Sequence, residues 1–155
     1  AHYPPTREFL DACDEIGLYV QCEAPFCWTS VDKAEEDEAN FPAFLEASAA
    51  MVEAHRNRPS IILWSLSNES NPNPRQGGFI GLLPIYRQLA EWYPTVDPSR
   101  ATTINNVWNN NGGLTDVANV HYPDHPDTRF ENYQHLAGDT RPALIDEHMH
   151  NHCYN

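Results

Sequence analysis

The stretch IILWSLSNES, residues 61–70, has the pattern of a buried strand that ends on a polar and an acidic residue. Its first six residues are mostly apolar, too uniformly for a strand with one face in water. Asn68 and Glu69 then stand side by side at its end. A similar run, RPALIDEH at residues 141–148, passes through three apolar residues and reaches Glu147. Two strand-like segments that end on a glutamate predict two carboxylates directed at one place.

Helix and strand signals alternate along the rest of the chain. A helix is predicted to start after Pro5 and end at Gly17, because prolines precede its helical spacing of apolar residues and a glycine follows. Further predicted elements are a strand at 18–25, helices at 42–56 and through Tyr86 to just before Pro94, strands at 101–106 and 117–123, and a short helix at 127–138. Hairpin signals are lacking, and parallel neighbours cannot be joined by tight turns. The order therefore predicts an α/β fold with a parallel sheet and crossover helices.

The charge of the chain limits its partners. Its 155 residues suit one domain or part of one, and 9 Lys plus Arg against 22 Asp plus Glu give a net charge of −13. Such a field repels phosphate and anionic lipid, so neither nucleic acid nor a membrane is expected as a partner. No signal-peptide pattern is recognised, and the localisation stays undetermined. Four cysteines without a CxxC pair are expected to be buried or idle thiols.

Polar residues gather where the predicted strands end. These residues are Glu23, Asn68 with Glu69, Asn105 with Asn106, His121 with Tyr122, and Glu147 with His148. In a (β/α)8 barrel the carboxyl ends of the strands share one rim, where active sites are built. Because no GxGxxG or GxxxxGK motif follows a strand, nucleotide binding is not supported.

Glu69 and Glu147 could supply the two carboxyl groups that glycoside cleavage requires. One carboxyl group protonates the departing oxygen, while the other attacks the anomeric carbon or activates water. Each carboxylate raises the cost of ionising the other, which helps to keep one of them neutral. Spacing alone leaves a second interpretation open, in which both glutamates are solvated caps of the helices that follow.

Three blocks of sequence resemble one enzyme family. HRNRPSIILWSLSNES at 55–70 closely resembles the fourth-strand segment of glycoside hydrolase family 2, which contains β-galactosidases, β-glucuronidases and β-mannosidases. Residues 1–28 resemble its passage from the second to the third strand, and residues 141–155 its seventh strand. The resemblance implies a (β/α)8 TIM barrel, of which residues 1–155 would supply about five βα units as a partial catalytic domain.

The resemblance also implies roles for individual residues. Glu69 matches the general acid/base and Glu147 the nucleophile of a retaining exo-β-glycosidase, most similar to a β-galactosidase. Retention requires carboxyl groups about 5 to 5.5 Å apart. Asn68 matches the residue that binds the sugar 2-hydroxyl. The other residues expected at the substrate are His2, Tyr122 or its neighbour His121 beside the nucleophile, His150, the rim residue Glu23, and the loop tryptophans Trp28 and Trp108.

The chain departs from the family pattern in several places. Ser67 stands where the family usually has glycine, and an arginine that commonly precedes HYP has no counterpart. Strands one, two and eight and the β-sandwich domains have no counterpart either, so the chain is expected to be a piece of a larger protein that is inactive alone. Its expected partners are a carbohydrate substrate and those remaining parts. No cofactor is expected, since EAPFCWTS at 23–30 lacks the second acid or histidine with which some β-galactosidases bind magnesium.

Two alternatives belong to other functional classes. The run HMHNHC at 148–153 could chelate zinc, although catalytic zinc sites usually draw ligands from more than one element. Trp28 and Trp108 could stack on sugars in a carbohydrate-binding module or a pseudoenzyme that performs no acid chemistry. Trp64, in the middle of a strand, is instead expected in the core.

Overall fold

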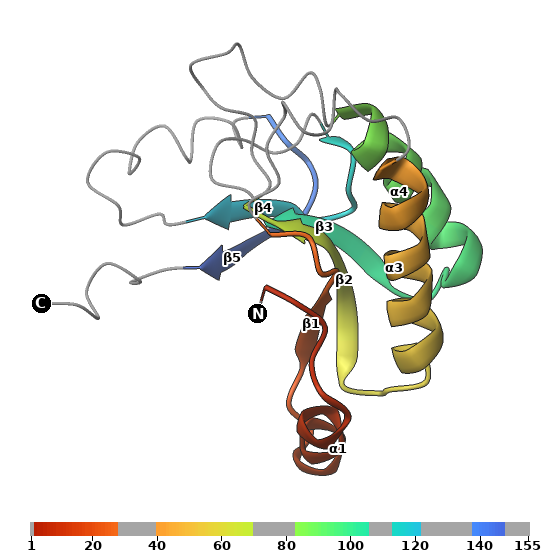
Figure 1. Ribbon diagram of the computed structural model, residues 1–155. Helices are drawn as coiled ribbons and strands as arrows, with labels where there is room; N and C mark the ends of the chain where they lie inside the picture. The colour runs from red at the N-terminus through yellow and green to blue at the C-terminus, as the bar shows by residue number, and fades with distance from the viewer. Residues whose placement is uncertain (1, 28–39, 70–82, 106–112, 122–137, 148–155) are drawn as a thin grey trace, which may run out of the picture.

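The computed structural model describes residues 2–27, 40–69, 83–105, 113–121 and 138–147, arranged as helices packed on parallel strands (Figure 1). The elements in chain order are α1 (Arg7–Ile16), β1 (Val20–Glu23), α3 (Asn40–His55), β2 (Ile61–Asn68), α4 (Leu83–Val96), β3 (Ala101–Asn105), β4 (Ala118–His121) and β5 (Ala143–Glu147). The predicted alternation of helix and strand is therefore confirmed from α1 to β3, and β4 and β5 follow as further strands in the described ranges. No helix in these ranges is long and apolar enough to cross a membrane.

The strands pair in the order in which they occur along the chain. β2 lies between β1 and β3 in one parallel sheet, and β4 pairs in parallel with β5 in a second. The backbone N–H of Val117 donates to the carbonyl of Thr102 at 3.0 Å, which holds the start of β4 against β3. Figure 1 shows α3 and α4 side by side on one side of these strands. All pairings between the described strands are parallel, as the lack of hairpin signals predicted.

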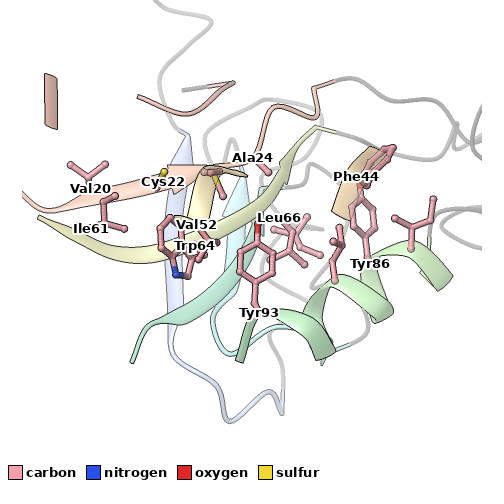
Figure 2. Close-up of a cluster of buried hydrophobic side chains, with 14 of the residues drawn as sticks. Val20, Cys22, Ala24, Phe44, Val52, Ile61, Trp64, Leu66, Tyr86 and Tyr93 are labelled. Carbon is pink, nitrogen blue, oxygen red and sulfur yellow. The ribbon is translucent and has the colours of Figure 1, made fainter. Parts of the chain in front are cut away.

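One face of the β1–β2–β3 sheet is apolar and packs on the helices. Cys22, Trp64 and Leu66 are fully buried in a cluster that includes Phe44 of α3 and Tyr93 of α4 (Figure 2). The ring centroids of Trp64 and Tyr93 lie 6.4 Å apart, within the range of favourable aromatic pairs. The prediction that Trp64 belongs to the core is confirmed.

The opposite face of the same strands is polar and equally buried. Glu23 pairs with Ser65 across β1 and β2, and Ser65 pairs with Thr103 on β3. All three side chains are almost inaccessible to solvent. Successive side chains of a strand point to opposite faces, so each strand contributes apolar residues to the helix side and polar residues to the other side. This second face leads directly to the strand ends where the candidate site lies.

The limits of α1 agree with those predicted from the sequence, and α3 begins slightly earlier than predicted. α1 begins after Thr6, whose hydroxyl accepts a hydrogen bond from the N–H of Phe9, and ends at Gly17 in the left-handed conformation (φ 74°), as predicted. α3 starts two residues before the expected Pro42. The predicted helix at 127–138 lies outside the described residues, apart from Gly138.

The prediction that a helix ends before Pro94 was wrong, because α4 continues to Val96. Proline removes one N–H donor from the last turn, but its φ angle fits a helix. The neighbouring Tyr93 is fully buried, and its carbonyl accepts from the N–H of Asp97 at 2.9 Å. Packing and this hydrogen bond therefore sustain a turn that the proline alone disfavours.

Asp97 links the end of α4 to the core strand. Its carboxylate accepts from the indole N–H of Trp64 at 3.0 Å and from Arg100 at 2.6 Å. Burial acts to raise the pKa of Asp97, but hydrogen bonds from Ser99, Arg100 and Trp64 outweigh it and lower the pKa to about 2. The stabilisation that the ionised Asp97 provides is therefore fully present above pH 3.8, the ordinary pKa of the group. It is lost as the pH falls through about 2.

Replacing Asp97 with alanine is expected to lower the free energy of unfolding at pH 7 by about 3 kcal/mol, because Arg100 and Trp64 lose their shared buried acceptor. The difference from wild type should shrink as the pH falls below about 4. Urea denaturation at several pH values measures both effects. Glu91→Ala, on the exposed side of α4, is the matched control. A loss of less than about 1 kcal/mol at pH 7 would contradict this role.

Candidate active site

Glu69 follows the last residue of β2 in an unusual backbone conformation. Its φ angle is 44°, in the left-handed region that side chains other than glycine rarely adopt. The backbone N–H of Glu69 donates to the carbonyl of Asn105 at 2.9 Å, so the end of β3 holds this conformation. Backbone strain of this kind concentrates at functional sites, where surrounding contacts fix it. The half-buried side chain of Glu69 is thus carried on a fixed backbone.

Asn68 is buried and joins three segments of the chain. Its side-chain amide donates to ring Nδ1 of His2 and, at 3.5 Å, to Sγ of Cys27. Its backbone N–H donates to the carbonyl of Phe26 at 2.8 Å. Two predicted site residues, His2 and Asn68, are therefore in direct contact although 66 positions separate them.

Glu147 ends β5 and pairs with His121 at the end of β4. Its side chain is half-buried, and its backbone N–H donates to Oδ1 of Asp146 at 2.7 Å. The other oxygen of Asp146 accepts from the amide of Asn119 at 3.1 Å. The end of β5 is thus ordered by contacts with its own neighbour and with β4.

Several carboxylates act electrostatically on the thiol of Cys27. Burial raises its pKa, the hydrogen bond from Asn68 lowers it, and the negative charges of Glu69, Glu23 and Glu147 raise it further. These three glutamates come from the ends of β2, β1 and β5. The structure thus brings the charges of both predicted catalytic glutamates to bear on one atom.

Glu23 is the most deeply buried of these three glutamates and is 1% exposed. Its Oε2 accepts from the hydroxyl of Ser65 at 3.0 Å and from the amide of Asn105. The carbonyl oxygen of the Asn105 side chain accepts in turn from Gln21 at 2.7 Å. Burial raises the pKa of Glu23 to about 7, and the charges of Asp146 and Glu147 act in the same direction.

Some predicted site residues cannot be placed. Tyr122, His150, Trp28 and Trp108 lie outside the described residues, as do the side chain of His121 and the possible zinc ligands at 148–153. Within the described ranges, no three His, Cys, Asp or Glu side chains gather as metal ligands would. The described cysteines Cys13, Cys22 and Cys27 are free thiols, as expected.

Sequence reasoning missed Cys27, Ser65 and Asp146 as members of this site. Each makes a hydrogen bond or bears a charge that acts on a residue that the sequence did single out. A signal was present for Ser65, because polar residues recur at every second position of WSLSN in an otherwise apolar strand. Such alternation indicates that the face opposite the helices is polar.

The thiol of Cys27 is expected to react slowly with iodoacetamide at pH 7, because the thiolate is the reactive form and its pKa is raised. Its alkylation rate should keep rising above pH 9, the ordinary pKa of the group. Mass spectrometry of the peptide that contains Cys27 measures the rate, with a cysteine in an unstructured peptide as the control. A rate that levels off below about pH 8.5 would contradict the raised pKa.

Comparison with known proteins identifies relatives over nearly the whole chain. The family model "Glycosyl hydrolases family 2, TIM barrel domain" matches residues 1–154. A β-galactosidase of Lactococcus lactis is 30% identical over 97% of this chain, and one of Aeromonas hydrophila is 33% identical over 97%. The chain spans only 15% of the length of each of these two relatives.

Solved structures share the fold. A family 2 β-galacturonidase from Eisenbergiella tayi, bound to galacturonate, has a TM-score of 0.79 and 26% identity over 96% of this chain and 28% of its own. A β-glucuronidase from Bifidobacterium dentium has a TM-score of 0.77 at 21% identity, over 96% of this chain and 26% of its own, and so supports the fold alone. The described strands and helices therefore belong to an α/β TIM-barrel fold.

Proposed function

Because the chain belongs to family 2 of the glycosyl hydrolases, in that family's TIM-barrel domain, we propose that it carries the active site of a retaining exo-β-glycosidase. Residues 1–155 form part of the catalytic domain in this proposal. Glu147 is the nucleophile, Glu69 is the general acid/base, and Asn68 binds the sugar beside the reacting carbon. Carbohydrate is the substrate, and the remaining parts of the protein complete the site.

One observation supports this assignment more than any other. The charges of Glu69 and Glu147, which end two different strands, both raise the pKa of the Cys27 thiol. Two solvated helix caps on separate sides of the molecule would have no reason to act on the same thiol. A pair of carboxyl groups at one rim is instead what double displacement requires.

In the first step of the proposed reaction, the Glu147 carboxylate attacks the anomeric carbon while Glu69 donates its proton to the departing oxygen. The bond to the leaving group breaks as the glycosyl–enzyme ester forms. The fixed backbone of Glu69 contributes by limiting the positions that its carboxyl group can reach.

In the second step, Glu69 is ionised and removes a proton from water, which attacks the anomeric carbon and releases Glu147. The two inversions give net retention. Asn68 would donate to the sugar 2-hydroxyl by redirecting the N–H that otherwise points to Sγ of Cys27 at 3.5 Å, and this interaction would strengthen in the transition state. The contact with His2 holds the other N–H and so orients the amide for that role.

We propose a terminal sugar of galacto configuration. Two relatives are β-galactosidases, and one related solved structure binds galacturonate, a uronic acid of the same configuration. The acidic charge of the chain favours the neutral sugar over the uronate, because like charges repel.

A panel of p-nitrophenyl β-glycosides tests the function in the whole protein. Hydrolysis of the β-galactoside is expected to exceed that of the glucuronide, mannoside and galacturonide. Proton NMR of the fresh product should detect the β-anomer first, as retention requires. Release of the α-anomer would exclude double displacement, and sugar binding without hydrolysis would favour a non-catalytic carbohydrate-binding protein.

A further inference from the structure

The carboxyl group of Glu23 is buried with its two oxygens in different surroundings. Oε2 accepts two hydrogen bonds, from Ser65 and from Asn105. Oε1 is buried and has no hydrogen-bond partner among the residues that the structure describes. A buried polar atom without a partner is costly, so it indicates a group or a protonation state that remains to be assigned.

Two acidic groups at the end of β5 act on Glu23. The carboxylates of Asp146 and Glu147 are negative and raise the pKa of Glu23. On its own strand the neighbouring Cys22 is a buried thiol, and beyond the strand Cys27 is half-buried. The partners on β2 and β3, Ser65 and Asn105, are uncharged. An ionised Glu23 would add a third negative charge to those of Asp146 and Glu147, which are half-buried.

We propose that Glu23 carries a proton on Oε1 and, as a neutral acid, donates toward the carboxylates at the end of β5, which makes it a positioning residue for the nucleophile Glu147. Oε2 already has Ser65 and Asn105 as hydrogen-bond partners, whereas Oε1 has none among the described residues, so we assign the proton to Oε1. An O–H there needs an acceptor, and Asp146 and Glu147 are the acidic groups that act on Glu23. This inference rests on the proposed function.

Loss of that proton reverses the interaction. An ionised Glu23 repels the β5 carboxylates instead of donating toward them, so it no longer orients Glu147. The raised pKa of about 7 places this change near neutral pH. Activity should therefore fall as the pH rises through about 7, independently of the titration of Glu69.

The variant Glu23→Gln separates this role from a structural one. Its amide oxygen can accept from Ser65 and Asn105, while its NH2 group donates permanently where Oε1–H does. A dinitrophenyl β-galactoside as substrate removes the need for protonation by Glu69, because its leaving group departs as a stable anion. With this substrate, wild-type kcat/KM should fall about tenfold for each pH unit above 7. The kcat/KM of the Glu23→Gln variant should stay within about tenfold of the wild-type value at pH 6 and should not fall above pH 7.

A second measurement does not depend on activity. A folded-state pKa above the ordinary 4.5 means that wild type loses stability as the pH rises from about 4.5 to 7. The melting temperature of the Glu23→Gln variant minus that of wild type should therefore rise over this range and then level off. Glu46→Gln, on the exposed side of α3, should show a constant difference.

Each outcome bears on a different statement. The positioning role would be overturned if kcat/KM fell above pH 7 equally in wild type and Glu23→Gln. It would also be overturned if a folded Glu23→Gln protein were as inactive as Glu147→Gln. A wild-type protein that hydrolyses no glycoside would overturn the proposed function and the positioning role with it, and the melting temperatures would still report whether Glu23 holds a proton.

Discussion

Replacing Glu147 with glutamine is expected to lower kcat for an aryl β-galactoside by about 10⁵-fold or more in the whole protein. The amide has nearly the same shape as the carboxylate but cannot form the glycosyl–enzyme ester. Binding should survive, because the fold of β5 depends on backbone pairing with β4 and on the contact between Asp146 and Asn119. Initial rates together with the inhibition constant for galactose measure the two effects separately.

Two further measurements make the Glu147 prediction specific. Glu46→Gln removes an exposed carboxylate from α3 and should leave kcat within about twofold. Azide can replace the missing nucleophile in Glu147→Gln, and one inversion would then give the α-glycosyl azide. A variant that retains a tenth of the wild-type rate would exclude Glu147 as nucleophile.

Replacing Glu69 with glutamine should reduce kcat by about 10²- to 10⁴-fold for a substrate with a poor leaving group. The loss should be much smaller in the first step with a dinitrophenyl leaving group, which departs without a proton. The second step still lacks its base, so the glycosyl–enzyme intermediate should accumulate and produce a burst. Stopped-flow absorbance detects this burst, and intact mass spectrometry detects the added sugar.

The left-handed backbone at Glu69 calls for a structural control. Glu69→Gly is expected to fold at least as well as Glu69→Gln, because glycine adopts a φ angle of 44° without steric cost. Added azide should accelerate turnover of both variants and give the β-glycosyl azide, since a strong nucleophile needs no base. Equal losses with good and poor leaving groups would contradict the acid/base role.

The core strand and the order of elements could be predicted from local sequence. The mostly apolar run at 61–66 and the helix before Gly17 required only a hydrophobic pattern, preceding prolines and a glycine, all within one segment. Pro94 misled the prediction because its local effect is real. The buried side chain of Tyr93 and the hydrogen bond from Asp97 outweigh it, and neither can be recognised from nearby residues.

The sequence by itself determined the α/β class, the parallel pairing and the two glutamates at strand ends. The hydrophobic periodicity and the order of helix and strand signals along the chain carry that information. Only the tertiary structure decided that His2 contacts Asn68 and that Glu69 and Glu147 act on the same thiol. It also decided that Glu23 lies buried with one oxygen unpartnered among the described residues. The pKa of a carboxyl group depends on burial and on charges brought from distant strands, and a linear pattern contains neither.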